Sequence, residues 1–136
     1  YVTDFPIDEK KNHDRVIALP HLGASTSEAE ENCAMMIVKQ IKDYLENGNI
    51  VNSVNFPDAK MPRAGMERLS ITHRNIPNMV RQITRAIAEE EANIVDMLNK
   101  SRGELAYTLI DIEDEISEFV IKNIEQVEGI LKVRVL

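Results

Sequence analysis

The sequence predicts an α+β protein whose second half is a βαββαβ unit. In that half, four short segments alternate apolar and polar residues, which is typical of strands with one buried face. Two further segments repeat apolar residues at helical spacing, which indicates amphipathic helices packed on the strands. Strands and helices in this order are typical of a ferredoxin-like fold, with both helices on one face of an antiparallel sheet.

The βαββαβ unit is predicted to span residues 66–136. In chain order, its segments are strand 66–73, helix 77–90, strand 93–100, a hairpin turn at 101–103, strand 104–113, a helix capped by Asp114 and ended by Gly129, and strand 130–136. Pro77 fits the first turn of a helix, because its fixed φ and missing N–H cost nothing there. In the first strand we expect Ser70 and Thr72 to face outward. A domain of this size is only marginally stable alone, so we expect its second sheet face or an edge to meet a partner.

Residues 1–65 are predicted to form a less regular region. They contain short strands at 1–6 and 16–19, a helix from Ser27 to Asn47, strand 50–56 and a proline-bearing linker at 57–65. Ser27 and Glu30 match a capping box, and Gly48 supplies a left-handed helix stop. Two short strands cannot form a core by themselves, so we expect the other strands of their sheet to lie upstream. We place a domain boundary after residue 65.

The composition argues against several classes of partner. The net charge of −7 and the pI of about 5.0 disfavour binding to nucleic acid or to an anionic membrane. Cys33 is the one cysteine, so neither a disulfide framework nor a thiolate metal cluster is expected. The acidic runs 89–91 and 113–115 are interpreted as solvated faces, and no metal site is predicted. Apolar runs fall short of the roughly 20 residues of a membrane span, so we expect a cytoplasmic protein.

Three blocks of the sequence resemble one protein family. They are VIALPHLGASTSEAEENC at 16–33, NGNIVNSVNFP at 47–57 and RLSITHRNIPNMV at 68–80. Together they resemble the C-terminal part of the D-3-phosphoglycerate dehydrogenases, which are NAD-dependent D-isomer-specific 2-hydroxyacid dehydrogenases of serine biosynthesis. Many members of this family end in a regulatory ACT domain. The resemblance implies that residues 1–65 are the C-terminal remnant of the catalytic domains, comprising the end of the NAD-binding domain and the return helix and strand of the substrate domain. Residues 66–136 would be the ACT domain.

The resemblance also implies a catalytic residue. The histidine of the family's Pro-His-x-Gly-x-Ser-Thr block is an acid/base, and here it is His21. An imidazole can take the proton of a substrate hydroxyl while hydride leaves for the nicotinamide. The family places a carboxylate beside this histidine, and counting from Phe5-Pro6 puts it at Asp8, with Glu9 next along. The NAD loop and the substrate-binding arginine would lie upstream, so this chain alone is predicted to hold no cofactor and to be inactive.

An effector site is implied as well. Family members that sense L-serine hold it at an interface between two ACT domains. The motif matches place the ligand contacts at His73, Asn75 and Asn93, with Asn93 coming from the other subunit. Amide side chains suit this task, because they offer both a donor and an acceptor to an amino acid. Asn78 and Glu91 stand where the family commonly has glycine, which lets the backbone approach a ligand.

Simpler interpretations of the same residues stay open. His21 could be a turn residue, His73 a polar residue that closes a strand, and Asn93 a turn residue that tolerates left-handed backbone. The ACT domain could act only as an oligomerisation module in a homo-oligomer, and the parent enzyme could act on another D-2-hydroxy acid. RNA binding by a βαββαβ unit needs basic charge and stacking aromatic residues, and here the first and third strands offer only Tyr107.

Overall fold

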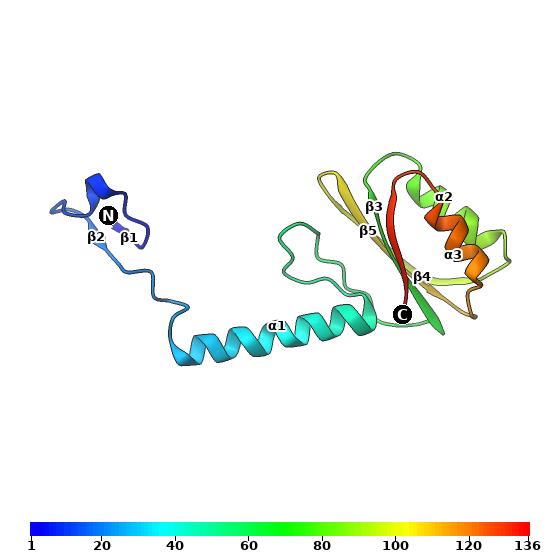
Figure 1. Ribbon diagram of the computed structural model, residues 1–136, viewed down its shortest axis with the longest axis horizontal. Coiled ribbons are helices and arrows are strands. Elements are labelled where there is room, and N and C mark those ends of the chain that lie inside the picture. Colours follow the sequence, from blue (N-terminus) through cyan, green and yellow to red (C-terminus); the bar gives the residue numbers. More distant parts are fainter. The chain divides into compact units, whose positions relative to one another are not determined.

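The structure contains two compact units, Tyr1–Lys39 and Gln40–Leu136. It is a computed structural model that describes residues 1–136, apart from the side chain at position 10. The first unit holds the strands β1 (Val2–Thr3) and β2 (Ile17–Ala18), with a short 3-10 helix, η1 (Asp8–Lys10), between them (Figure 1). The two strands pair in parallel, Val2 opposite Ile17. The short strands that the sequence predicts in this region therefore pair with each other.

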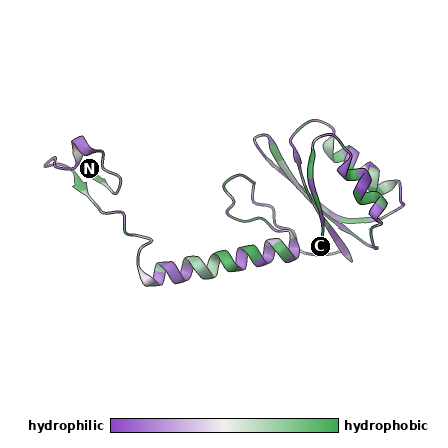
Figure 2. Ribbon diagram, in the orientation of Figure 1, coloured by the Kyte–Doolittle hydropathy of each residue, from purple (hydrophilic) through white to green (hydrophobic). Residues whose placement is uncertain are grey.

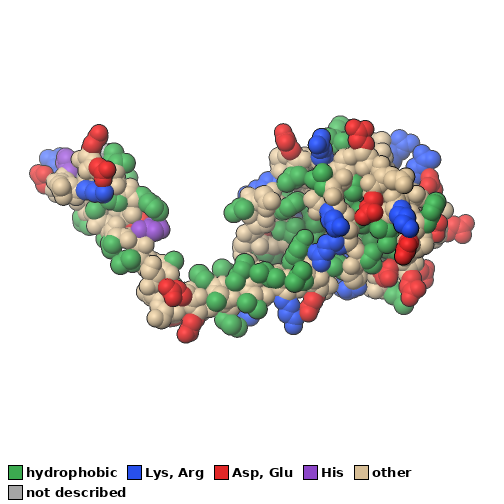
Figure 3. Space-filling view, viewed as in Figure 1, with side chains coloured by type: hydrophobic (Ala, Val, Ile, Leu, Met, Phe, Trp, Pro, Cys, Tyr) green, Lys and Arg blue, Asp and Glu red, His purple; other side chains and the backbone are tan. Residues whose placement is uncertain are grey.

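The helix α1 (Ser27–Asn47) starts in the first unit and ends in the second. Its N-terminal cap is Thr26 rather than the predicted Ser27, because the Thr26 hydroxyl accepts a hydrogen bond from the N–H of Ala29 at 3.1 Å. It ends as predicted before Gly48, which has a left-handed φ of +70°. Hydrophobic and hydrophilic residues are interspersed along the helix in Figure 2, and apolar side chains lie on its surface in Figure 3. The large exposed ones are Met35, Met36, Ile37, Val38, Ile41, Tyr44 and Leu45.

Four strands form the sheet of the second unit, in the order β4-β5-β3-β6 with every neighbouring pair antiparallel. They are β3 (Glu67–Arg74), β4 (Ile94–Arg102), β5 (Leu105–Ile112) and β6 (Ile130–Val135). The helices α2 (Met79–Ala88) and α3 (Glu118–Glu125) lie together on one face of this sheet (Figure 1). This order of elements and strands confirms the predicted α+β class and the ferredoxin-like, ACT-like βαββαβ fold.

The last helix begins later than the sequence predicts. Ser117, not Asp114, caps α3, and its hydroxyl accepts a hydrogen bond from the N–H of Val120 at 3.3 Å. The segment before the cap is held in another way, because the N–H of Ile116 donates to the carboxylate of Glu67 at 2.8 Å. This long-range bond connects the residues just before α3 with the first residue of β3.

The main core lies between the two helices and the sheet. Each fully buried aliphatic side chain in it contributes about 1.5–3 kcal/mol relative to an exposed one. The strands supply Leu69, Ile71, Ile110, Ile112 and Val133, and the helices supply Ile83, Ala86, Ile87, Val120 and Ile124. These residues occur at strand and helix spacing in the sequence, so the periodicity predicted which strand and helix faces form the core between the helices and the sheet.

The second face of the sheet is covered by segment 49–61 of the same chain. Ile50, Ala59 and Met61 from this segment pack against Tyr107 and Leu109 of β5. The predicted strand 50–56 is wrong, because the segment forms only one isolated bridge, between Ile50 and Ala59. The predicted outward position of Ser70 is also corrected: its face of β3 is covered, and the residue is 3% exposed. The compact unit therefore extends on the N-terminal side of the predicted start at residue 66.

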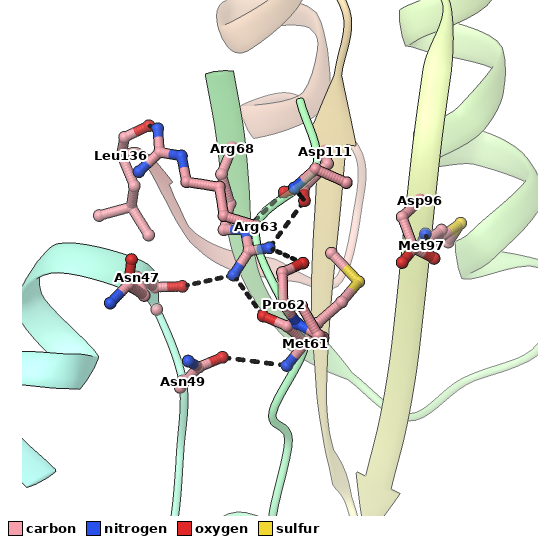
Figure 4. A network of polar contacts seen from close by, with 12 residues as sticks. Asn47, Asn49, Met61, Pro62, Arg63, Arg68, Asp96, Met97, Asp111 and Leu136 are labelled. Atoms are coloured by element: carbon pink, nitrogen blue, oxygen red, sulfur yellow. Dashed lines mark hydrogen bonds and ion pairs between the residues drawn. The ribbon is translucent and has the colours of Figure 1, made fainter. Parts of the chain in front are cut away.

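A buried ion pair joins β3 to β5 on this covered face. Arg68 and Asp111 are both fully buried, and their side chains form two hydrogen bonds, at 2.5 and 2.7 Å (Figure 4). Burial alone would raise the pKa of Asp111, but hydrogen bonds from Arg68 and from the N–H groups of Ala64 and Gly65 outweigh it and hold the pKa below its ordinary value. Asp111 is therefore a carboxylate inside the protein.

Candidate functional site

The first candidate site is the loop between β3 and α2, which holds His73, Asn75 and Asn78. His73 is the last buried residue of β3, 2% exposed, and both of its ring nitrogens have partners. Nδ1 lies 2.9 Å from the carbonyl oxygen of Arg74, and Nε2 lies 2.9 Å from the hydroxyl of Thr108. A ligand can bind a ring nitrogen of His73 only by replacing one of these contacts.

The contacts of His73 continue across the sheet to its edge strand. The hydroxyl of Thr108 lies 2.9 Å from Oδ1 of Asn99 on β4 as well as 2.9 Å from His73. Oδ1 of Asn99 can only accept, so the single hydroxyl hydrogen of Thr108 goes to Asn99 and the hydroxyl can only accept from Nε2 of His73. His73 is thus linked through Thr108 to the edge strand β4.

Asn75 is held by the turn between β4 and β5. Its backbone N–H donates to the carbonyl of Glu104 at 2.8 Å, and its Nδ2 donates to the carbonyl of Gly103 at 3.0 Å. The side-chain oxygen of Asn75 is therefore the atom that it can offer as an acceptor to a ligand. Asn75 lines an open surface hollow together with Arg74, Ile76, Gly103, Glu104, Leu105 and Leu131. Two opposite charges, on Arg74 and Glu104, thus border the same hollow as Asn75.

Asn93 lies at the other end of the sheet. It directly precedes β4, whose first residue, Ile94, pairs with Ile112 at the end of β5. Its Nδ2 donates to the carboxylate of Glu113 at 2.6 Å. His73, in contrast, pairs with Ala106 at the start of β5. One chain therefore brings His73 and Asn75 together but not Asn93, and a site with all three residues needs a second chain.

The two positions where the resemblance leads us to expect glycine have a left-handed backbone. Asn78, the residue before α2, has a φ of +73°, and Glu91, before β4, has a φ of +57°. Asparagine adopts this region more readily than most residues, whereas an ordinary side chain costs on the order of 1–2 kcal/mol there. Both positions therefore have a backbone conformation that favours glycine, although the residues there, Asn78 and Glu91, carry side chains.

The second candidate site is the pair formed by His21 and Asp4 in the first unit. Nδ1 of His21 lies 2.6 Å from Oδ2 of Asp4, and the ring of Phe5 lies 4.1 Å from the imidazole, centroid to centroid. The predicted partner Asp8 instead forms an ion pair with Lys11 at 2.5 Å. The structure therefore pairs His21 with Asp4 rather than with Asp8.

The parallel pairing of β1 and β2 explains this difference. Thr3 pairs with Ala18, so the residues that follow the two strands emerge on the same side, and these include Asp4 and His21. Counting along the chain from Phe5 could not find this neighbour, since it lies across the strand pair. A carboxylate on Nδ1 fixes the imidazole ring and leaves Nε2 for proton exchange with a substrate, which is the arrangement of a general acid/base.

Within the described part of the chain, no three His, Cys, Asp or Glu side chains lie close enough together to hold a metal ion. No described helix is both long and apolar enough to cross a membrane.

Comparison with known proteins finds relatives along most of the chain. D-3-phosphoglycerate dehydrogenase of Escherichia coli (strain K12) is 30% identical over 125 residues, which are 90% of this chain and 30% of that protein. The enzyme of Haemophilus influenzae is 29% identical over 131 residues, 96% of this chain and 32% of that protein. D-3-phosphoglycerate dehydrogenase 2 of Saccharomyces cerevisiae is 30% identical over 114 residues. The chain spans about a third of the length of the bacterial relatives, and it matches their C-terminal part. No family model matches the chain.

Solved structures resemble about half of the chain. The ACT domain from GTP pyrophosphokinase of Chlorobium tepidum shares 18% identity, covers 52% of this chain and 95% of that chain, and has a TM-score of 0.46. The regulatory subunit of aspartate kinase from Thermus thermophilus shares 10% identity, covers 52% of this chain and 49% of that chain, and has a TM-score of 0.44.

Proposed function

We propose, from the homology of this chain to the C-terminal part of D-3-phosphoglycerate dehydrogenases, that it is the regulatory part of such an enzyme. The observation that carries the proposal is the extent of this homology, which includes 90% of the chain and so reaches both the His21 segment and the βαββαβ unit. The His21–Asp4 pair supports an acid/base role for the first unit in the parent enzyme, acting on 3-phosphoglycerate. Another D-2-hydroxy acid is the alternative substrate of the parent.

The cofactor of the parent enzyme would be NAD, which accepts the hydride. The residues of this chain do not fit a dinucleotide site of their own. Its five glycines, at positions 23, 48, 65, 103 and 129, are too far apart to form a glycine-rich pyrophosphate loop. His21 would therefore hold or move the substrate proton at Nε2, while the rest of the reaction depends on residues outside this chain.

The regulatory ligand that we propose is an amino acid, with L-serine favoured, bound at an interface between two chains. The hollow beside Asn75 supports this class of ligand, because Arg74 can attract a carboxylate and Glu104 an ammonium group. The free Oδ1 of Asn75 adds an acceptor for an ammonium or hydroxyl hydrogen. His73 would hold the conformation of the loop between β3 and α2 through its contacts with Arg74 and Thr108.

Calorimetric titration of the 136-residue chain with L-serine tests the effector proposal. We expect saturable heat with L-serine and at least about tenfold weaker binding by an Asn75→Ala variant, because a lost hydrogen bond to a charged group costs about 1.5–3 kcal/mol. Asn55→Ala is the matched control. Asn55 is an exposed residue of segment 49–61, which covers the second face of the sheet, and this variant should bind as the original chain does. Equal heats from L-serine and glycine would contradict a role for the ligand hydroxyl.

A second proposed function, assembly without a ligand, has its own support in β4. This strand has one neighbour in the sheet, β5, so its other edge presents backbone groups that a second copy can pair with. Sedimentation of the chain measures this role directly. A stable dimer that gives no heat with any amino acid would favour the assembly role, whereas a monomer at high concentration would exclude both the assembly role and the interface site.

A further inference from the structure

The C-terminal turn of α1 needs partners that the helix does not contain. The last carbonyl groups of any α-helix have no N–H partner within the helix, and the partial negative charge there favours nearby cations. The last turn of α1 has no basic residue. Its carbonyl groups must therefore be satisfied from outside the helix.

Three arginines from other elements of the second unit supply these partners. Each guanidinium donates to a different carbonyl oxygen in the last three positions of the helix. The pairs are Arg134 with Leu45 at 3.2 Å, Arg63 with Glu46 at 3.5 Å, and Arg68 with Asn47 at 3.0 Å. Arg68 belongs to β3 and Arg134 to β6, while Arg63 lies four residues before the first residue of β3.

Each arginine is itself fixed in place. Besides Asn47, Arg68 donates to the carboxylate of Asp111 and to the carbonyls of Met61 and Pro62, at 2.9 and 2.8 Å, so that all of its N–H groups are used (Figure 4). Arg63 also donates to the carbonyl of Leu136. The guanidinium of Arg134 lies over the ring of Tyr44, 4.8 Å from its centroid.

The residue after the helix sits tightly on the same sheet. The carbonyl of Gly48 accepts a hydrogen bond from the buried hydroxyl of Tyr107 at 2.7 Å. A Cβ atom at Gly48 would come within 2.9 Å of side-chain carbons of Leu136 and Leu109. Little room therefore remains between the helix end and the sheet.

We infer that Arg63, Arg68 and Arg134 form an arginine socket that fixes the C-terminal turn of α1 to the sheet. The three are positioning residues, because they act on the helix and not on a ligand. The three arginines and residues 45–47 all belong to the second unit, so the socket lies within that unit. The socket itself does not depend on a ligand, so it can be tested without one.

Amide hydrogen exchange, followed residue by residue by NMR, tests the socket in the full 136-residue chain without amino acids. We expect the Arg63→Gln/Arg134→Gln double variant to exchange the amides of residues 44–48 at least about fivefold faster, since loss of partners lets a helix end open locally. Exchange in β3 and β5 should stay unchanged. The Arg68→Met/Asp111→Leu variant, which replaces the buried pair with apolar side chains, should also speed exchange at 44–48.

Arg102→Gln is the matched control. Arg102 also donates to three backbone carbonyls, those of Ser53, Val54 and Phe56, but it lies away from α1. It should speed exchange at 52–58 and leave 44–48 unchanged. Unchanged exchange at 44–48 in the Arg63/Arg134 variant overturns the socket, and this variant, which leaves the fully buried Arg68–Asp111 pair in place, decides the question even if that pair cannot be replaced. Failure of L-serine to bind would instead overturn the proposed effector function and leave the socket intact.

Discussion

At the scale of single residues, the second unit keeps two charges in its interior by bonding all five N–H groups of the Arg68 guanidinium and both carboxylate oxygens of Asp111. The guanidinium of Arg68 and the carboxylate of Asp111 bond each other, and the N–H of Ala64 donates to the same carboxylate at 2.7 Å. A buried ion pair is tolerated only with such complete bonding, and removal of one partner costs about 3–5 kcal/mol. The pair therefore specifies how segment 61–64 meets the sheet.

The lowered pKa of Asp111 predicts how the free energy of unfolding depends on pH. Its ordinary pKa is 3.8, and the folded value lies below this. In the range between the two values, the unfolded chain binds a proton that the folded chain does not. The stabilisation is therefore fully present above pH 3.8 and is lost as the pH falls through the folded pKa.

Urea unfolding at a series of pH values below 5 measures this dependence. The free energy of unfolding of the original chain should fall more steeply with acid than that of the Arg68→Met/Asp111→Leu variant, which lacks the titrating group. Equal slopes would show that Asp111 titrates alike in the folded and unfolded chains. A Glu113→Gln variant, altered at an exposed carboxylate, serves as the control and should keep the steep slope.

At the scale of elements, the segment between α1 and β3 acts as the cover of the second sheet face. Asn49 links both of its ends, because its Oδ1 accepts from the N–H of Met61 at 3.1 Å and its Nδ2 donates to Asp43 in α1 at 3.0 Å. Gly65 then passes so close to β5 that a Cβ atom would lie 2.3 Å from the carbonyl oxygen of Ile112. Only glycine allows this approach without moving the backbone.

Gly65→Ala should therefore destabilise the second unit by about 2 kcal/mol or more, as overpacking against a fixed backbone does. Thermal unfolding followed by circular dichroism measures the change. Gly23→Ala is the matched control, because a Cβ atom there meets nothing within 4 Å and its backbone is not left-handed. We expect Gly23→Ala to change stability by less than about 0.5 kcal/mol. Equal melting temperatures for the two variants would contradict the close approach at Gly65.

At the scale of the whole molecule, the effector proposal requires two chains. His73 and Asn75 lie near the turn between β4 and β5, whereas Asn93 lies by Glu113 at the opposite end of the strands. A symmetric dimer has two such sites, each with Asn75 from one chain and Asn93 from the other.

Mixing two variants that each bind L-serine poorly tests this shared site. Asn75→Ala and Asn93→Ala chains should each bind L-serine poorly alone. After co-refolding, random pairing makes half of the dimers mixed, and each mixed dimer has one intact site, so about a quarter of the original sites should return. Calorimetry counts them. A mixture that binds no better than its components would show that the two asparagines do not share a site.

Much of the second unit could be predicted from local sequence pattern. The alternation around Leu69 and Ile71, the helical spacing in α2 and α3, and the helix stop at Gly48 depend on neighbours within a few residues, and these elements form as predicted. The helix starts were displaced, because Thr26 and Ser117 cap in place of Ser27 and Asp114. Several polar residues near a helix start can cap it, and the pattern alone does not choose among them.

The sequence by itself determined the α+β class and the order of the βαββαβ unit, and its family resemblance supplied the predicted site residues His21, His73, Asn75 and Asn93. Only the tertiary structure decided which of them meet. It placed Asp4 beside His21 across a parallel strand pair, separated Asn93 from Asn75, and gave the end of α1 its arginine partners. The physical reason is that periodicity reports which side of an element is apolar, whereas contacts between polar groups far apart in the chain depend on strand register and on which segment covers a face.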